Sequence, residues 1–170
     1  ERERRMIFNE DANKYLRFDP SSLFGVIIGI KCLKENEEIL NKPVTESFNF
    51  TDKKQCEIIA DKIYFSPLLF LATTENPFKR EIREYPIDFS FPTSKRYNVL
   101  IDLPEGYLVE SIPNTMNIAT LENISSFKYL IVNLGNKIQL SVTFDINVAI
   151  VTSDYYEIMK AFFKQLIEKQ

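Results

Sequence analysis

The sequence predicts a mainly β fold: an antiparallel β-sandwich, Ig-like in general architecture, with a C-terminal amphipathic α-helix packed on it. From Ile138 to Ile150 apolar and polar residues alternate, which is typical of a strand with one face on the core and the other in water. Aromatic residues that favour strands are frequent, with 14 Phe and 8 Tyr. The helical crossovers that a parallel sheet requires are missing from the pattern. These observations together favour antiparallel sheets.

The beginning of the chain differs from the rest. Residues 1–24 are predicted to be a lead-in segment, partly helical or a linker, and residues 25–170 to form a single β-sandwich domain. Weak helical periodicity over residues 8–18 ends at the Asp-Pro-Ser-Ser stretch of residues 19–22. After this stretch, period-two alternation of the residues predicts the first strand of the domain.

Period-two alternation and turn residues predict the strands in order. Pro86 lacks a ladder donor, so the extended segment Arg83–Phe91 is placed at an edge or a bulge. The Pro-Glu-Gly step at residues 104–106 predicts one hairpin. Gly135-Asn136 predicts a second, because this pair suits a turn that needs a positive φ at its first central residue. The other predicted strands are Val26–Leu33, Val44–Phe50, Glu57–Phe65, Tyr97–Leu103, Tyr107–Ile112, Phe127–Leu134 and Lys137–Val151.

A C-terminal helix is predicted over residues 153–169. Ser153 or Asp154 is suited to cap it, and Glu157 lies three residues after Asp154, as in a capping box. The apolar face of this helix predicts packing on the sheet, with docking of another domain as the alternative. That face consists of Tyr155, Met159, Phe162, Phe163 and Leu166.

The composition disfavours catalysis and nucleic-acid binding. The chain has no histidine, which removes the commonest general base and metal ligand. We therefore predict no enzyme activity and no catalytic, cofactor-binding or metal-binding residue. A net charge of -3 argues against a nucleic-acid partner. No apolar run reaches the length of a membrane span, so no membrane insertion is expected.

Two further patterns are weak. Cys32 and Cys56 are the only cysteines, too few for a disulfide framework or a four-cysteine zinc site. They are expected to be free, with a single bridge between them left open.

Ser125 and Lys128 have the spacing of a serine-lysine acyl-enzyme motif, but that motif opens a helix and this segment reads as a strand. We take the match as chance.

One candidate interaction surface is aromatic. Tyr85, Phe89, Phe91 and Tyr97 are suited to line a sugar-binding groove, because their rings stack on the apolar faces of sugars. Core filling is the alternative interpretation. The neighbouring carboxylates have no metal-ligand companions and are predicted to form a solvated face. They are Glu81, Glu84 and Asp88.

Several motifs are distinctive of one family. The chain reads Asp-Lys-Ile-Tyr-Phe-Ser-Pro-Leu-Leu-Phe at residues 61–70, Glu-Asn-Pro-Phe-Lys at 75–79 and Arg-Glu-Tyr-Pro-Ile-Asp-Phe at 83–89. Leu-Pro-Glu-Gly-Tyr at 103–107 and Ser-Asp-Tyr-Tyr at 153–156 follow. With these motifs the chain resembles the C-terminal domain of unknown function that follows a transglutaminase-like core in bacterial, envelope-associated multidomain proteins.

This resemblance implies a β-sandwich that comes last, after a papain-like Cys-His-Asp core. The upstream core would be the partner, and this chain a noncatalytic accessory or interaction domain that positions or gates it. We expect the isolated domain to be a monomer and the location to be periplasmic or in the cell envelope. Because Glu1 is not a start methionine, we expect a mature product or a piece of a longer protein. The alternative is an independent glycan- or peptide-binding module.

Overall fold

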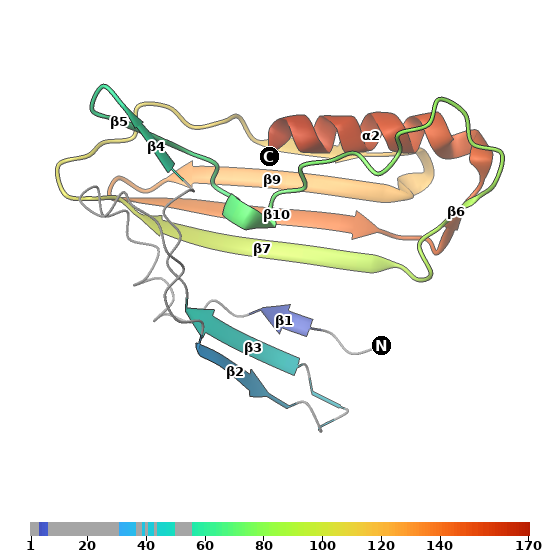
Figure 1. Cartoon of the computed structure of the whole chain (residues 1–170), viewed down its shortest axis with the longest axis horizontal. Coiled ribbons are helices and arrows are strands. Elements are labelled where there is room, and N and C mark those ends of the chain that lie inside the picture. Colours follow the sequence, from blue (N-terminus) through green and yellow to red (C-terminus); the bar gives the residue numbers. More distant parts are fainter. Residues whose placement is uncertain (1–3, 7–30, 37–38, 40, 43, 50–55) are drawn as a thin grey trace. The chain divides into compact units, whose positions relative to one another are not determined.

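The computed structural model shows a mainly β protein with antiparallel sheets and a C-terminal helix, which confirms the predicted fold class (Figure 1). The chain divides into two compact units, one made of residues 1–65, 100–108 and 135–138 and the other of the remaining residues. The expected limits of the domain, residues 25–170, stay a prediction. The structure describes residues 4–6, 31–36, 39, 41–42, 44–49 and 56–170.

The first unit contains a three-stranded sheet. Its middle strand, β3, pairs antiparallel with β2 and parallel with β1. The predicted strand at Val44–Phe50 is thereby confirmed. Residues 26–30 of the predicted first strand, like the lead-in helix over 8–18, lie outside the described residues. The strands are β1 (Arg4–Met6), β2 (Lys31–Glu35) and β3 (Val44–Asn49).

The predicted strand Glu57–Phe65 is instead a hairpin of β4 (Cys56–Ile59) and β5 (Lys62–Phe65). Ala60 and Asp61 form its two-residue turn, with φ of 47° and 65°. Both angles are positive, as in the mirror-image turns whose twist matches that of paired strands. The alternation continues across the turn, which is why the sequence reads as one strand.

A four-stranded sheet follows in the order β7-β10-β9-β8. Strands β8, β9 and β10 are consecutive neighbours, and β7 lies beside β10, which makes a Greek-key arrangement. The predicted hairpin at residues 104–106 is wrong. Its turn forms, with the Tyr107 N–H donating to the Pro104 carbonyl at 3.2 Å, but β10 takes the place beside β7 and residues 107–112 form no strand. The strands are β7 (Thr93–Asp102), β8 (Met116–Ala119), β9 (Ser125–Asn133) and β10 (Lys137–Ile146).

The hairpin between β9 and β10 is confirmed. Gly135 has a φ of +88°, a left-handed conformation that glycine adopts without a Cβ penalty. Beside the turn the Leu103 N–H donates to the Asn136 carbonyl at 3.0 Å, and Lys137 and Asp102 form an ion pair at 2.8 Å. These contacts fix the register of β7 against β10.

The last predicted strand ends earlier than expected, at Ile146. The Asn147 N–H donates to the Ile124 carbonyl at 2.8 Å, which turns the chain out of the strand. A separate strand β11 (Ile150–Val151) then pairs antiparallel with β6 (Ile87–Asp88). The prediction that Ile150 lies on the buried face is wrong, because its side chain is 62% exposed.

Helix α2 (Tyr156–Lys169) follows the 3-10 turn η4 (Ser153–Tyr155). The predicted capping box is wrong, since no side chain caps either element. Ser153 and Asp154 are inside the 3-10 turn and therefore cannot cap the helix from outside. The buried face is as predicted except that Tyr156 replaces Tyr155, and it consists of Tyr156, Met159, Phe162, Phe163 and Leu166. Further 3-10 turns are η2 (Leu69–Leu71) and η3 (Leu121–Asn123).

Helix α2 packs on one face of the four-stranded sheet. Phe144 of β10 stacks on Phe162 with ring centroids 6.3 Å apart and meets Phe163 edge to face at 5.6 Å. On β9 the residues from Ser125 to Ile131 are alternately buried and exposed or half-buried, so every second side chain faces the helix. This confirms that the amphipathic face serves core packing.

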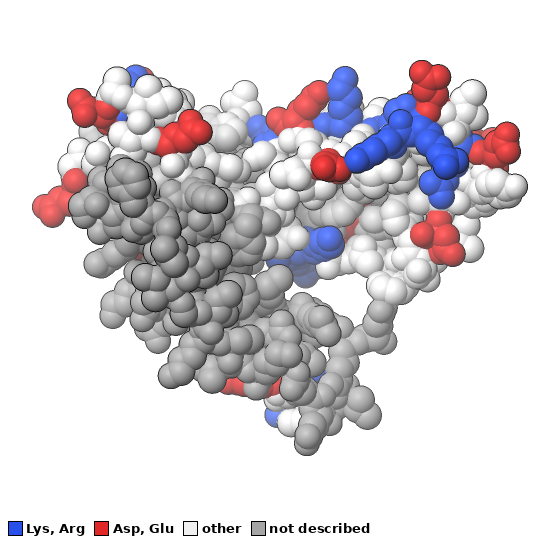
Figure 2. Space-filling view, in the orientation of Figure 1, with Lys and Arg blue, Asp and Glu red and all other residues white. Residues whose placement is uncertain are grey.

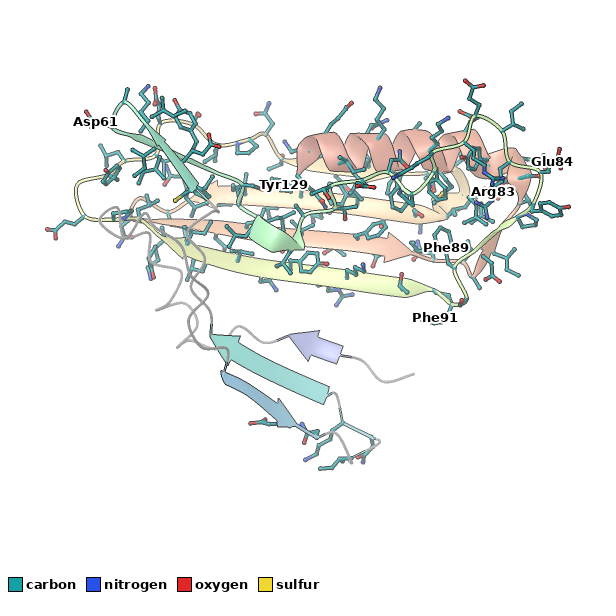
Figure 3. The ribbon with its side chains drawn as sticks, viewed as in Figure 1. Asp61, Arg83, Glu84, Phe89, Phe91 and Tyr129 are labelled. Atoms are coloured by element: carbon teal, nitrogen blue, oxygen red, sulfur yellow. The ribbon has the colours of Figure 1, made fainter. Side chains whose placement is uncertain are left out.

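Tyr129 of β9 places a phenol hydroxyl in this core (Figure 3). Its side chain is 1% exposed, and its hydroxyl has no hydrogen-bond partner among the described residues. The Lys169 ammonium lies 5.2 Å from the centre of the ring. An unsatisfied buried hydroxyl costs about 1–3 kcal/mol.

We expect Tyr129→Phe to keep or raise the free energy of unfolding, by up to about 1 kcal/mol, because it removes a buried hydroxyl without a partner. Tyr156→Phe is the matched control. Its hydroxyl donates to the Arg80 carbonyl at 2.8 Å, so its loss should lower stability by about 1 kcal/mol. Urea unfolding measures both, and a Tyr129→Phe variant as unstable as Tyr156→Phe would contradict the assignment.

Alkaline pH provides a second test of the same residue. Burial raises the pKa of the Tyr129 hydroxyl. Because the folded state favours the neutral form, the unfolded state loses the proton first, and the free energy of unfolding should fall as pH rises above about 10. Urea midpoints from pH 8 to 12 should fall less steeply in Tyr129→Phe, and equal slopes would refute this. The pH values of this scan bracket the ordinary tyrosine pKa of about 10.

Candidate interaction surface

A loop that runs along helix α2 in the second unit is attached to the helix by hydrogen bonds and a ring contact. Residues 76–86, which we call the anchored loop, connect η2 to β6 (Figure 1). Phe78 inserts its ring edge to face against Phe163 at 5.1 Å and against Tyr156 at 5.7 Å. Since Phe163 also contacts Phe144 of the sheet, one helix residue joins the sheet and the loop.

Asn76 fixes the start of the anchored loop. Its amide nitrogen donates to the Lys160 carbonyl on α2 at 3.0 Å. Its amide oxygen accepts from the Phe78 N–H at 2.9 Å, an Asx turn that sets the direction of the chain. One side chain thus bonds both the helix and its own loop.

The Arg80 carbonyl is the second attachment. It accepts a hydrogen bond from the Tyr156 hydroxyl at 2.8 Å and one from the Lys160 ammonium at 2.9 Å. The ammonium also lies 5.9 Å from the centre of the Tyr156 ring, at the limit of a cation–π contact. A charged donor makes this attachment stronger than an ordinary neutral hydrogen bond.

Beyond Arg80 the loop is shaped by one of its own side chains. Arg83 donates from Nε to the Tyr85 carbonyl at 3.0 Å and from Nη2 to the Pro86 carbonyl at 3.2 Å. Figure 3 shows the Arg83 side chain lying along the chain and Glu84 extending away from it. The forked guanidinium therefore satisfies two carbonyls that would otherwise face water.

Two large apolar side chains of the anchored loop are exposed, in contrast to the buried Phe78. Ile82 is 80% exposed and Tyr85 is 77% exposed. Ile150, opposite Asp88 in the β6–β11 pair, is also exposed, as is Phe91. A loop with ordered backbone, internal hydrogen bonds and outward apolar side chains is suited to binding another surface.

The four aromatic residues of the predicted surface differ in their exposure. Tyr85 is exposed on the anchored loop, and Phe91 is exposed before β7, whereas Phe89 is half-buried. Between them Ser90 has a φ of 67° and donates its N–H to Asp88 Oδ1 at 2.7 Å, which turns the chain (Figure 3). Tyr97 is half-buried, and burial raises the pKa of its hydroxyl.

The predicted solvated face is exposed at Glu81, Glu84 and Asp88. Sequence reasoning missed Ile82 and Arg83. The sequence does show that these two residues lie among carboxylates, and that they follow an Asn-Pro step, which marks a loop. That pattern does not reveal that the arginine turns inward and the isoleucine outward.

The remaining chemical candidates of the sequence are Cys56 and the Ser125–Lys128 pair. No cluster of three or more His, Cys, Asp or Glu that is suited to hold a metal ion occurs there. Burial raises the pKa of the Cys56 thiol, which lowers its thiolate fraction. Ser125 is buried and its hydroxyl faces Met159 Sδ at 3.8 Å, while Lys128 is exposed on the opposite face of β9, so the two do not meet. No helix in the described part is long and apolar enough to cross a membrane.

Comparison with known proteins gives one match. A family model described as "Domain of Unknown Function with solved-structure structure (DUF3858)" matches residues 61–170. No curated protein and no solved structure matches the chain. The matched range includes the whole anchored loop, the four-stranded sheet and helix α2.

We expect Arg83→Gln to loosen the anchored loop without unfolding the domain, because it removes the donors that hold the Tyr85 and Pro86 carbonyls. Cleavage after Glu84 by a glutamyl endopeptidase should become several-fold faster, since proteolysis follows local opening. Arg96→Gln, a change at an exposed arginine of β7, is the control. Equal cleavage rates in the two variants would show that Arg83 does not order the loop.

Proposed function

The chain belongs to the DUF3858 family of domains of unknown function, and on this premise we propose that it is a noncatalytic interaction domain. In this proposal it stands at the C-terminal end of a transglutaminase-like protein and positions or gates the upstream core. The family resemblance described above supports the upstream core as partner and a periplasmic or cell-envelope location.

The anchored loop is the observation that carries the proposal. Ile82 and Tyr85 expose large apolar side chains, while the backbone beneath them is bonded to α2 through Arg80 and to itself through Arg83. Loops at a protein surface normally expose charged side chains and bury large apolar ones. A preorganised loop loses little conformational entropy on binding, so more of its contact energy is available for a partner.

The noncatalytic part of the proposal is supported by the chemistry that the chain contains. A cysteine or serine nucleophile needs a neighbouring base, most often an imidazole, and the sequence has no histidine. The raised pKa of Cys56 points in the same direction. In a papain-like arrangement the thiolate and imidazole would have to come from the upstream core.

The exposed aromatic rings of Tyr85 and Phe91 favour a second candidate, a glycan- or peptide-binding module. Against it, Phe89 and Tyr97 are half-buried and offer less ring surface to a ligand. We therefore place the interaction with a protein core first.

The test is crosslinking in the native protein. Tyr85→p-benzoylphenylalanine should, on irradiation of living cells, form adducts with a transglutaminase-like region of the same polypeptide, mapped by mass spectrometry. Lys128→p-benzoylphenylalanine, at an exposed position of β9, is the control and should give few adducts. A Tyr85 yield no higher than that of the control would refute the proposal, and glycan adducts would favour the binding module instead.

A further inference from the structure

We infer that the anchored loop docks through Tyr85 into an apolar pocket whose rim carries lysine or arginine side chains. This inference rests on the proposed interaction role and adds the chemistry of the partner surface. It follows from the anchor residue, from the order of the loop around it and from the signs of the exposed charges beside it.

Tyr85 is suited to be the anchor. Tyrosine is enriched among residues that dominate binding energy, because a large ring is buried with only two side-chain torsions to fix. Its main chain is held in place, since its carbonyl accepts from Arg83 Nε. Ile82 is exposed on the same loop and adds apolar surface three residues earlier. Such a projecting pair requires a concave apolar surface on the partner.

The exposed charges next to the anchor are predominantly negative. Glu84 precedes Tyr85 directly and extends away from the chain, and Glu81 and Asp88 are exposed on either side along the sequence (Figure 3). Arg83 is the cation within this stretch, but its guanidinium is directed at two carbonyls of its own loop. A partner that meets Tyr85 therefore meets carboxylates first, and complementary lysines or arginines would stabilise it.

The basic groups lie toward the helix instead. The Lys160 ammonium is bonded to the Arg80 carbonyl, and Lys79 forms an ion pair with Glu75 at 2.6 Å. Figure 2 shows acidic groups at the outer margin of this end of the molecule and basic groups set back from them. Along the loop the exposed cations Lys79 and Arg80 precede the exposed carboxylates Glu81 and Glu84, an order that would help to orient a partner.

The experiment measures the crosslink yield of a second probe, Ile82→p-benzoylphenylalanine, in the native protein in living cells. Added Tyr85→Ala should lower the yield about tenfold or more, as expected for an anchor residue. Added Glu84→Lys should lower it about threefold to tenfold, because a cation would then face the basic rim. Glu105→Lys, at an exposed turn residue distant in sequence, is the matched charge control and should leave the yield unchanged.

The outcomes separate this inference from the proposed function. If the probe reaches a protein partner but Glu84→Lys matches Glu105→Lys, or the mapped partner region has no lysine or arginine, the basic-rimmed pocket is wrong and the interaction role stands. If neither the Ile82 nor the Tyr85 probe yields a protein adduct, both are wrong. Glycan adducts of the Ile82 probe would likewise contradict the inference of an apolar pocket with a basic rim.

Discussion

The packing of Phe163 is the interaction on which the rest of the second unit depends. Its ring meets Phe144 of the sheet on one side and Phe78 of the anchored loop on the other, at 5.6 and 5.1 Å. Each edge-to-face pair contributes about 0.5–1.5 kcal/mol beyond the burial of apolar area. Phe163 therefore contacts the sheet and the loop at once, and the loop cannot keep its position if the helix moves.

This packing explains how a segment without regular secondary structure presents a defined surface. Hydrogen bonds of polar side chains hold the loop in place: Asn76 and Lys160 bond the loop to the helix, and Arg83 bonds the loop to itself. The apolar Ile82 and Tyr85 are left in water, an arrangement that costs solvation free energy in the isolated domain. Burial of these side chains by a partner would recover that free energy.

The noncatalytic role that we propose agrees with this division. Its side chains are arranged for packing and for hydrogen bonds to the main chain, and the lack of histidine removes the group that most often moves protons. In the proposed function the binding surface is a loop held by a sheet and a helix, as in many binding domains. The chemistry of the inferred pocket is argued from that loop, whereas the proposed partner rests on the family resemblance of the sequence motifs.

The sequence by itself determined the elements whose signals are local. The alternation up to Ile146, the Gly135-Asn136 turn and the apolar face of α2 each need only neighbouring residues to be recognised. Tertiary structure decided which strand lies beside β7, that Ile150 faces water, and that Arg83 turns inward while Tyr85 turns outward. These outcomes depend on contacts between residues distant in sequence, where apolar strands compete for the same neighbour and a side chain bonds whichever carbonyls the fold brings near. The periodicity of the sequence does not show which of these distant contacts forms.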